Sequence, residues 1–297
     1  MDKFFQKIPF IDHILKGIGQ IMLQENRWTG LLFLIGIFLG SWEGGIAVLL
    51  STAAGTFTAM QLKYDQAEIK AGLYGFSAAL VGVALSFLFE ATALIWVLIV
   101  LGGALATVIQ HFFIQKKIPV FTFPFILVTW GLVFVLHHFT HIPPSELFRS
   151  EVVPTDYDDF LTCTNGFGEV IFQGGVLSGM IFFLAVFISS PIAALYGLAA
   201  SILGAGLSQV NGESMKEIHM GLFGFNAVLS AIVFSGVKKT DGLWVLIAVF
   251  LTVVIDDFLV DNNLLKEVGG VFTFPFVAGT WVTLLIRKGA MKVIKKA

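Results

Sequence analysis

Three short motifs occur twice in this chain, and this duplication constrains its fold more than any other feature. The segment Gly72-Leu-Tyr-Gly-Phe-Ser-Ala-Ala-Leu80 returns 149 residues later as Gly221-Leu-Phe-Gly-Phe-Asn-Ala-Val-Leu229. The segment Val120-Phe-Thr-Phe-Pro-Phe125 returns unchanged 151 residues later, and both copies are followed by a Thr-Trp pair. Gly19-Gln-Ile-Met-Leu-Gln24 aligns with Gly168-Glu-Val-Ile-Phe-Gln173, again 149 residues later. Because three blocks recur in one order at nearly one offset, the sequence predicts two homologous halves, residues 1–145 and 146–297.

The composition indicates a membrane protein. Of the 297 residues, 57% are hydrophobic and 13% are charged, whereas a soluble domain carries about a quarter charged residues. The mean hydropathy is +0.88, so the chain lacks the polar coat that a soluble protein needs. The sequence therefore predicts an all-α integral membrane protein that crosses the cell (inner) membrane several times.

Several function classes are disfavoured by the same inspection. The formal net charge is −2 and no long basic run occurs, so we expect no nucleic-acid partner. Cys163 is the only cysteine, which excludes an intrachain disulfide and a thiolate metal site. The phosphate-binding pattern Gly-x4-Gly-Lys-Ser/Thr is missing from the sequence, so we expect no ATP hydrolysis of that type to drive transport in this chain. We expect no cofactor, no metal and no catalytic residue.

Six apolar stretches occur in each half, and several are shorter than the about 20 residues that a spanning helix needs. They lie near residues 12–25, 28–41, 44–62, 72–89, 91–114 and 119–139, and near 160–175, 176–190, 192–208, 221–236, 242–260 and 268–287.

Charged residues predict the topology, because lysine and arginine collect on the cytoplasmic side. They place both termini and two connections inside: Lys3, Lys7 and Lys16; Arg287, Lys288, Lys292, Lys295 and Lys296; Lys116-Lys117; and Lys238-Lys239. An acidic connector at about 140–160 is predicted to lie outside, and Asp256, Asp257 and Asp261 are predicted to lie in an outer loop.

The topology requires an odd number of crossings in each half. Six stretches then fit best as about five transmembrane helices and one half-membrane re-entrant helix. Halves with an odd number of spans are inverted relative to each other about an axis in the membrane plane, and the transport site lies between them. The sequence therefore predicts inverted repeats with a pore at their interface.

The paired Gly-Leu-Tyr/Phe-Gly-Phe blocks, the paired Thr-Phe-Pro-Phe…Thr-Trp blocks and the Gln20/Glu169 pair together resemble the signature of the urea transporter family, in its bacterial form. The resemblance covers essentially the whole chain. It implies a passive, channel-like conduit for urea or a close analogue, in a membrane-embedded homotrimer with one pore per subunit.

The resemblance also implies the residues of a narrow slot with oxygen acceptors along its edges. The predicted substrate and pore residues are Phe76, Leu80, Val170, Phe172, Phe225 and Leu229 for the walls, and Gln20, Glu169, Thr129 and Thr280 for hydrogen bonding. The two halves differ at two family positions. Ser77 stands where the second half has Asn226, and Leu23 stands where it has Phe172.

These residue types suit a flat, neutral solute with four N–H donors around one carbonyl. A bilayer excludes urea because its polar groups would lose their hydration without new partners, which costs several kcal/mol. An intramembrane carboxylate such as Glu169 is a functional residue by default. Proline favours a first helical turn, so Pro124 and Pro275 are predicted to set where a helix begins or bends.

Other functions stay open at this stage. One is a channel for another small solute, such as ammonia, short amides or formate. Another is a proton-coupled transporter that uses Glu169, alone or together with Asp256 or Asp257. An intramembrane enzyme is disfavoured because Glu169 has no histidine nearby in sequence and no His-Glu-x-x-His motif occurs.

Overall fold

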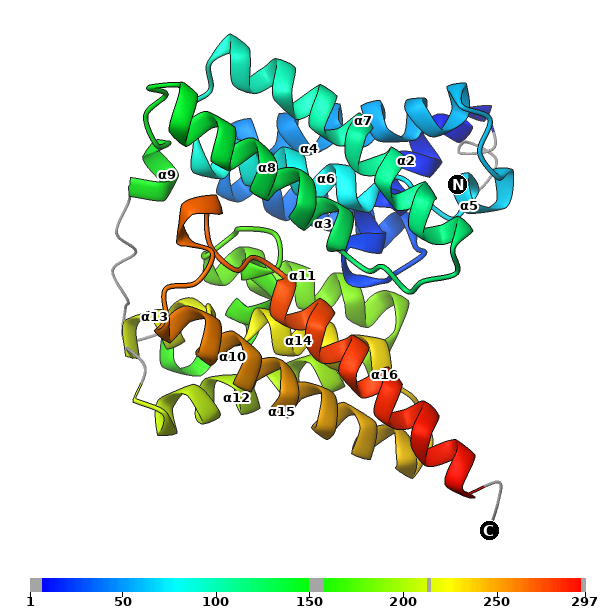
Figure 1. Cartoon of the computed structure of the whole chain (residues 1–297), viewed down its shortest axis with the longest axis vertical. Coiled ribbons are helices and arrows are strands. Elements are labelled where there is room, and N and C mark those ends of the chain that lie inside the picture. Colours follow the sequence, from blue (N-terminus) through cyan, green and yellow to red (C-terminus); the bar gives the residue numbers. More distant parts are fainter. Residues whose placement is uncertain (1–6, 150–157, 213–214, 295–297) are drawn as a thin grey trace.

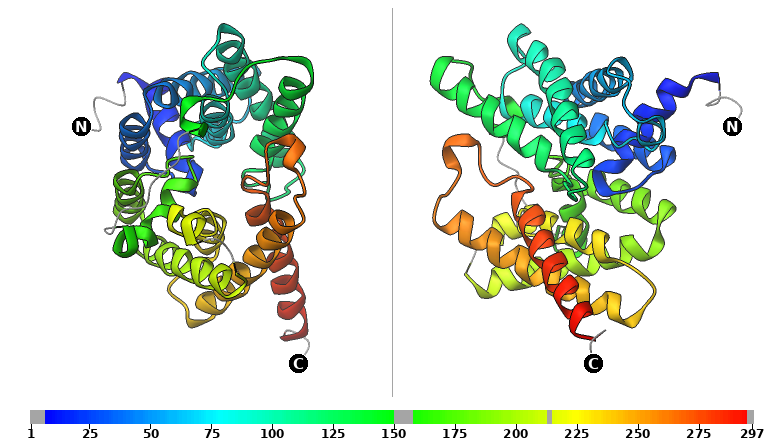
Figure 2. Two further views of the ribbon diagram at one scale, coloured as in Figure 1. Left: turned by 90° about the vertical axis from the view of Figure 1, so that its left-hand side faces the viewer. Right: turned by 45° about the vertical axis from the view of Figure 1, so that its right-hand side comes forward.

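The computed structural model describes residues 7–149, 158–212 and 215–294. Across these ranges the chain is helical, and its extended pairing is an isolated bridge between Phe89 and Pro144. The first part of the chain, blue to green, lies beside the second part, yellow-green to red (Figure 1), and two further views show the same arrangement (Figure 2).

The same order of helices occurs before and after the 150–157 gap. The first series is α2 (Pro9–Gly19) with η1 (Gln20–Met22), α3 (Arg27–Gly40), α4 (Trp42–Gln61), α5 (Gln66–Lys70), α6 (Phe76–Leu88), α7 (Ala93–Gln115) and α8 (Phe123–Phe139). The second is α10 (Asp158–Glu169), α11 (Val176–Ser189), α12 (Pro191–Val210), α13 (Met215–Met220), α14 (Phe225–Phe234), α15 (Lys239–Asp261) and α16 (Phe274–Ile294). The short α9 (Glu146–Arg149) follows the first series, and η2 (Lys266–Val268) precedes α16.

Among the described residues, three helices are long and apolar enough to cross a membrane: α7, α12 and α15. The 23 residues of α7 and of α15 correspond to about 35 Å at 1.5 Å per residue, which exceeds the about 30 Å hydrocarbon core. Large apolar side chains stay exposed on these helices, including Leu101 on α7 and Phe250 on α15. An exposed apolar belt of this kind is the surface that a helical membrane protein presents to lipid.

Each predicted apolar stretch of the described chain contains a helix. Polar N-caps set several of the starts: Asn26 accepts from the Trp28 backbone N–H at 2.8 Å, and Ser41 accepts from that of Gly44 at 2.9 Å. Such caps satisfy donors that the first helical turn leaves free. The predicted role of Pro124 is confirmed, because it occupies the first turn of α8. Pro275 is likewise the second residue of α16.

The first glycine of the repeated Gly-Leu-Tyr/Phe-Gly motif is required by geometry. Gly72 has a φ of +80° and Gly221 a φ of +86°, a region that disfavours any residue with a Cβ atom. A Cβ on Gly72 would lie 2.5 Å from the Gly17 nitrogen, and one on Gly221 would lie 2.6 Å from the Asn165 carbonyl carbon. The motif therefore lets the turn before α6 or α14 approach the backbone of α2 or α10.

Helices α3 and α11 join the two parts through equivalent residues. Phe33 packs edge-on against Phe182, with ring centroids 5.2 Å apart, and these residues are 149 positions apart. Two hydrogen bonds flank the rings and mirror each other: Thr29 Oγ1 donates to the Ala185 carbonyl at 2.7 Å, and Ser178 Oγ donates to the Gly36 carbonyl at 3.0 Å. The main buried core includes residues from both parts of the chain.

Some predictions concern residues that the structure does not describe. The acidic connector at about 140–160 falls partly on residues 150–157, and Lys3, Lys295 and Lys296 also lie outside the described residues. The short α5 and α13 helices were not predicted, because they contain five and six residues and carry charged side chains.

The close contact between α2 and α3 depends on Gly30. A Cβ atom at this position would overlap the carbonyl oxygen of Leu15. We expect Gly30→Ala to destabilise the protein by about 1–3 kcal/mol, the usual effect of overpacking, and to lower the melting temperature in detergent. Gly131→Ala is the control, because a Cβ there meets nothing within 4 Å. An unchanged melting temperature in Gly30→Ala would contradict the described packing.

Candidate functional site

Two cavities lined by described residues contain the predicted site residues discussed below. The first cavity has a volume of about 230 Å³ and is lined mostly by apolar side chains. Its lining comprises Gln20, Ile21, Leu23, Leu73, Phe76, Gln110, Ile114, Ile118, Pro119, Val120, Phe121, Thr122 and Phe276.

The second cavity is larger, with a volume of about 580 Å³. Residues of its lining that matter below are Glu169, Val170, Phe172, Leu222, Phe225, Asp256, Val271, Phe272 and Thr273. Two acidic side chains therefore face this cavity.

The linings of the two cavities correspond position by position. Gln20, Leu73 and Phe76 of the first cavity align with Glu169, Leu222 and Phe225 of the second. The same holds for three further pairs of aligned residues: Leu23 with Phe172, Phe121 with Phe272, and Thr122 with Thr273. Each half therefore contributes the same set of positions to one cavity, and the other half adds residues to it, such as Phe276 in the first cavity and Phe87 in the second.

A hydrogen bond between two equivalent threonines connects the two linings. Thr122 Oγ1 and Thr273 Oγ1 lie 2.6 Å apart, and both hydroxyls are buried. These residues directly precede α8 and α16, whose first turns meet between the two parts of the chain (Figures 1 and 2).

Aromatic rings surround this hydrogen bond in a reciprocal pattern. Phe125 lies 5.6 Å from Phe272, and Phe121 lies 5.3 Å from Phe276, measured between ring centroids. Two hydrogen bonds from tryptophan indoles follow the same reciprocal pattern between the halves. Trp130 Nε1 donates to the Gly270 carbonyl at 2.9 Å, and Trp281 Nε1 donates to the Pro119 carbonyl at 2.6 Å. Phenylalanine rings therefore pack around the Thr122–Thr273 bond, where the two linings meet.

Both cavities lie beside the C-terminal end of a short helix. The turn after α2 has Leu23 in a left-handed conformation with a φ of 58°, and the turn after α10 has Phe172 with a φ of 57°. The backbone reverses at these residues. The last carbonyls of a helix have no intrahelical partner and carry partial negative charge. The turns supply donors to some of these carbonyls: the backbone N–H of Gln24 donates to Gly19 and that of Gln173 donates to Gly168, each at 3.1 Å.

Gln20 presents its oxygen to the first cavity. Its side-chain nitrogen donates to the Ala71 carbonyl at 2.9 Å, and this bond fixes the amide with Oε1 available as an acceptor. Glu169 lies at the equivalent place in the second cavity and supplies carboxylate oxygens. Both aligned positions thus offer oxygen acceptors.

Thr129 and Thr280 are fully buried, and their hydroxyls lack a hydrogen-bond partner in the described structure. Each lies one helical turn beyond a wall phenylalanine, Phe125 or Phe276, on the same helix face. Buried polar groups are nearly always hydrogen-bonded, and an unpaired one needs an explanation.

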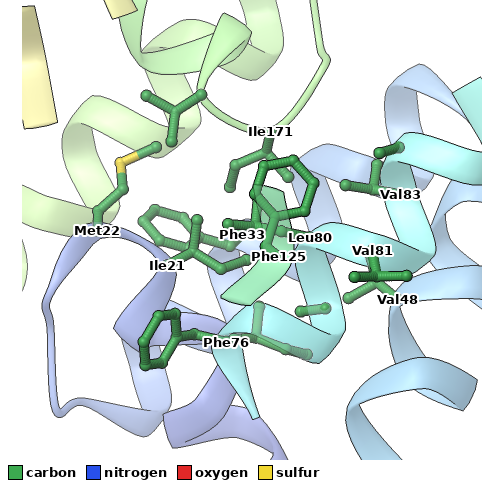
Figure 3. Close-up of a cluster of buried hydrophobic side chains, with 14 of the residues drawn as sticks. Ile21, Met22, Phe33, Val48, Phe76, Leu80, Val81, Val83, Phe125 and Ile171 are labelled. Carbon is green, nitrogen blue, oxygen red and sulfur yellow. The ribbon is translucent and has the colours of Figure 1, made fainter. Parts of the chain in front are cut away.

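The other predicted wall residues divide into two groups. Phe76 lines the first cavity, and Val170, Phe172 and Phe225 line the second. Leu80 and Leu229 are fully buried and lie outside both linings. Figure 3 shows Leu80 with Phe33, Phe125 and Ile171, in the packed core where the two parts of the chain meet.

The prediction that Asp256 and Asp257 lie in an outer loop is wrong. Both are buried in the last turns of α15. Asp256 accepts from Asn226 Nδ2 at 3.0 Å, while Asp257 accepts from Ser208 Oγ and Asn211 Nδ2. These donors come from α12, α14 and the C-cap of α12, and they replace the water that an exposed loop would have supplied.

Sequence reasoning named Asp256 as a candidate for proton coupling but missed its counterpart in the first cavity, Gln110. Gln110 is the eighteenth residue of α7, and Asp256 is the eighteenth residue of α15. Ser77 Oγ donates to Gln110 Oε1 at 3.2 Å, just as Asn226 donates to Asp256. Alignment of the two helices by their ends would have revealed this equivalence.

A hydrogen-bonded cluster lies behind the first cavity. The Tyr74 hydroxyl contacts Glu68 Oε2 at 2.5 Å and His111 Nδ1 at 2.8 Å, and the His111 ring stacks on Tyr64. Burial, assisted by the bond to Glu68, raises the pKa of the Tyr74 phenol. The cluster joins α5 to α7 next to Gln110 and thereby supports the lining of the first cavity.

These features define a class: a helical membrane protein with two mostly apolar cavities whose linings include oxygen acceptors and meet at a buried threonine pair among packed aromatic rings, as expected of a transport protein. The family model of the urea transporter matches residues 11–288. The chain belongs to the urea transporter family, as its motifs predicted. This family is one of transport proteins rather than enzymes.

Curated relatives agree with this assignment. The chain is 30% identical to urea transporter 1 of Rattus norvegicus over 246 residues and 30% identical to that of Mus musculus over 250 residues. It is 29% identical to urea transporter 1 of Ovis aries over 252 residues. The matches cover 77–78% of this chain, which spans 64% of the length of each relative.

The threonine bond between the cavities makes a testable contribution to stability. Thr122→Val and Thr273→Val each leave one buried hydroxyl unpaired, so we expect each to cost about 1–3 kcal/mol. We expect the double variant to lose clearly less than the sum, because it removes both polar groups. A double-mutant cycle on thermal unfolding in detergent measures this coupling. Thr122→Val combined with Thr283→Val is the control, since Thr283 bonds to Gly279 within its own helix. Additive losses of unfolding free energy in both cycles would contradict the hydrogen bond between Thr122 and Thr273.

Proposed function

We propose that this protein is a passive, channel-like conduit that lets urea diffuse down its gradient. The pair of buried, unpartnered hydroxyls on Thr129 and Thr280 carries the proposal. A passing solute with N–H donors supplies the partners that these oxygens lack. Membership of the urea transporter family supports urea as that solute.

The chemistry of the path suits a flat, neutral donor molecule. Gln20 lines the first cavity and Glu169 lines the second. Thr129 and Thr280 lie outside both linings, and in this proposal their unpartnered hydroxyls are the acceptors between the two ends. Each neutral hydrogen bond contributes about 1 kcal/mol net, which replaces hydration without trapping the solute. The phenylalanine walls admit a planar molecule and offer nothing to a hydrated ion.

The repeats are inverted in this proposal, and residues 1–145 and 146–297 are its two membrane repeats. Equivalent residues contact each other at Phe33–Phe182 and at Thr122–Thr273. A residue meets its own counterpart only near a two-fold axis, as in an isologous interface. The reciprocal indole and hydroxyl bonds support the same axis.

The helices account for five crossings and one re-entrant segment in each half. We assign α2 and α10 as the re-entrant segments because the backbone reverses directly after each of them, at Leu23 and at Phe172; their 11 and 12 residues do not distinguish them, since α14 has 10. An ion pair between Arg27 and Asp12, at 2.8 Å, joins the start of α3 to the first part of α2. The chain therefore comes back after α2 to the side on which α2 begins, as a re-entrant segment requires. Basic residues at Lys116-Lys117 and Lys238-Lys239 put the first cavity on the cytoplasmic side, with both termini.

The assembly in this proposal is a homotrimer in the cell (inner) membrane, with one pore per subunit. The apolar residues exposed on α7, α12 and α15 are its lipid-facing or subunit-facing surface. The family resemblance, rather than any contact in the single chain, supports three subunits.

A proton-coupled transporter is the second candidate. Asp256 and Glu169 face the same cavity, which brings two carboxylates to the path where the first half has two glutamines. Ion-coupled transporters use carboxylates of this kind as proton relays. The Asn226 bond to Asp256 instead fits a structural role for that carboxylate.

Stopped-flow light scattering on proteoliposomes tests the proposed function. We expect urea flux well above that of protein-free vesicles, whereas glycerol and formate stay at the protein-free level. Flux of ammonia, an amide or formate in place of urea would support another small solute. A steep pH dependence of urea flux that Glu169→Gln abolishes would favour proton coupling. Urea flux equal to that of empty vesicles would contradict the proposal.

The threonine hydroxyls give a sharper test. We expect Thr129→Val and Thr280→Val each to lower urea permeability about fivefold, the equilibrium equivalent of one hydrogen bond of about 1 kcal/mol. Valine has a similar shape but accepts no hydrogen bond. Thr283→Val is the matched control, because Thr283 is equally buried on α16 but donates to the Gly279 carbonyl. Equal permeability in all three variants would rule out the threonines as acceptors.

A further inference from the structure

We infer that Asn226 and Asp256 form a positioning pair that holds Phe272 against the second cavity and thereby sets which solutes enter from that end. The inference rests on the proposed function and adds a specificity-determining element to it. Asn226 itself lies outside the cavity lining, so it acts through Phe272 rather than on the solute.

Both the nitrogen and the oxygen of the Asn226 side-chain amide form hydrogen bonds. Its Nδ2 donates to Asp256 Oδ2 at 3.0 Å and to the Phe272 carbonyl at 3.2 Å, and its Oδ1 accepts from the Phe276 backbone N–H at 3.3 Å. Carboxylate and carbonyl oxygens accept only, so these partners fix the orientation of the amide. Asn226 is 1% exposed.

These hydrogen bonds hold the turn at Phe272 and the start of α16, whose backbone conformation the local sequence does not favour. Phe272 has a φ of +46°, and this left-handed conformation costs a non-glycine residue about 1–2 kcal/mol. The Phe276 N–H belongs to the first turn of α16, where no intrahelical acceptor exists. Asn226 therefore acts on both sides of the turn at Phe272 and fixes the direction in which α16 begins.

Phe272 shapes the entrance of the aromatic passage. Its ring lies 6.0 Å from Phe172 and 5.6 Å from Phe125, centroid to centroid, and it lines the second cavity. Because Asn226 follows Phe225 directly, the same helix end also supplies a second aromatic residue of the cavity lining. A shift of the Phe272 backbone would change the width between these rings.

The first half has the same strained residue without the same support. Phe121 has a φ of +49°, and the counterpart of Asn226 is Ser77, whose hydroxyl donates to Gln110 at 3.2 Å. Within the described residues, Ser77 makes no hydrogen bond to the 120–125 segment. The second cavity is therefore the rigid, size-selecting end, and the first cavity is the more adaptable end.

Paired measurements on Asn226→Ser, which introduces the side chain of the first half, test this inference. We expect the ratio of 1,3-dimethylurea to urea permeability to rise about fivefold, the factor that one hydrogen bond carries. Ser77→Ala is the matched control and keeps the wild-type ratio. Asp256→Ala is expected to raise the ratio as Asn226→Ser does, whereas Asp256→Asn retains an acceptor oxygen and keeps it low.

Amide hydrogen exchange in detergent gives a readout that does not depend on transport. In the wild type we expect the 271–276 segment to exchange more slowly than the 120–125 segment, and Asn226→Ser to remove the difference. Equal exchange of the two segments in the wild type, or an unchanged permeability ratio in a folded Asn226→Ser variant, would overturn the inference. Slow exchange of 271–276 in a wild type that conducts no urea would instead support the pair and contradict the proposed function. If Asn226→Ser does not fold, the wild-type exchange comparison and the two Asp256 variants decide the question.

Discussion

Helix ends that stop inside an apolar interior are the constraint on which the rest of this structure depends. The helices α2 and α10 end, and α8 and α16 begin, next to the two cavities. Each end leaves backbone groups without an intrahelical partner, and lipid offers none. The chain meets this need with side chains such as Asn226, which accepts from the Phe276 N–H. Carbonyl groups at the ends of α2 and α10 accept from the turns that follow, as those of Gly19 and Gly168 do from the backbone N–H groups of Gln24 and Gln173. The same irregular backbone therefore shapes the fold and the proposed path.

Duplication limits which residues can stand where the two halves meet. A residue that faces its own counterpart must be complementary to itself. Threonine meets this condition because one hydroxyl can donate while the other accepts, as at Thr122 and Thr273. Phenylalanine meets it by an edge-on arrangement, which puts the positive ring edge of one partner against the negative face of the other, as at Phe33 and Phe182. A lysine or a carboxylate would face a like charge there.

Local patterns predicted much of the fold, and contacts between distant segments account for what they missed. The apolar stretches, the start of α8 at Pro124 and the duplicated blocks were all readable from the sequence, since each depends on neighbouring residues. The burial of Asp256 was not, because an acidic pair near the end of an apolar stretch looks like a solvated loop. Its partner Asn226 lies 30 residues away on another helix. Thr129 and Thr280 were found by their repeated position, but their lack of a partner depends on the assembled structure.

The two cavities share a framework but differ in charge, and this difference bears on how a neutral solute moves. Gln20 and Gln110 of the first cavity align with Glu169 and Asp256 of the second. Amide and carboxylate oxygens both accept from an N–H group, so a urea-like solute finds acceptors at each end. Bonds to a charged acceptor are about twice as strong as neutral ones, which would hold the solute longer in the second cavity. Asn226 offsets this by donating to Asp256, since a carboxylate already engaged by an amide has less capacity left for the solute. The proposed channel-like function requires weak binding at every site along the path, and the Asn226 bond takes up part of the acceptor capacity of Asp256.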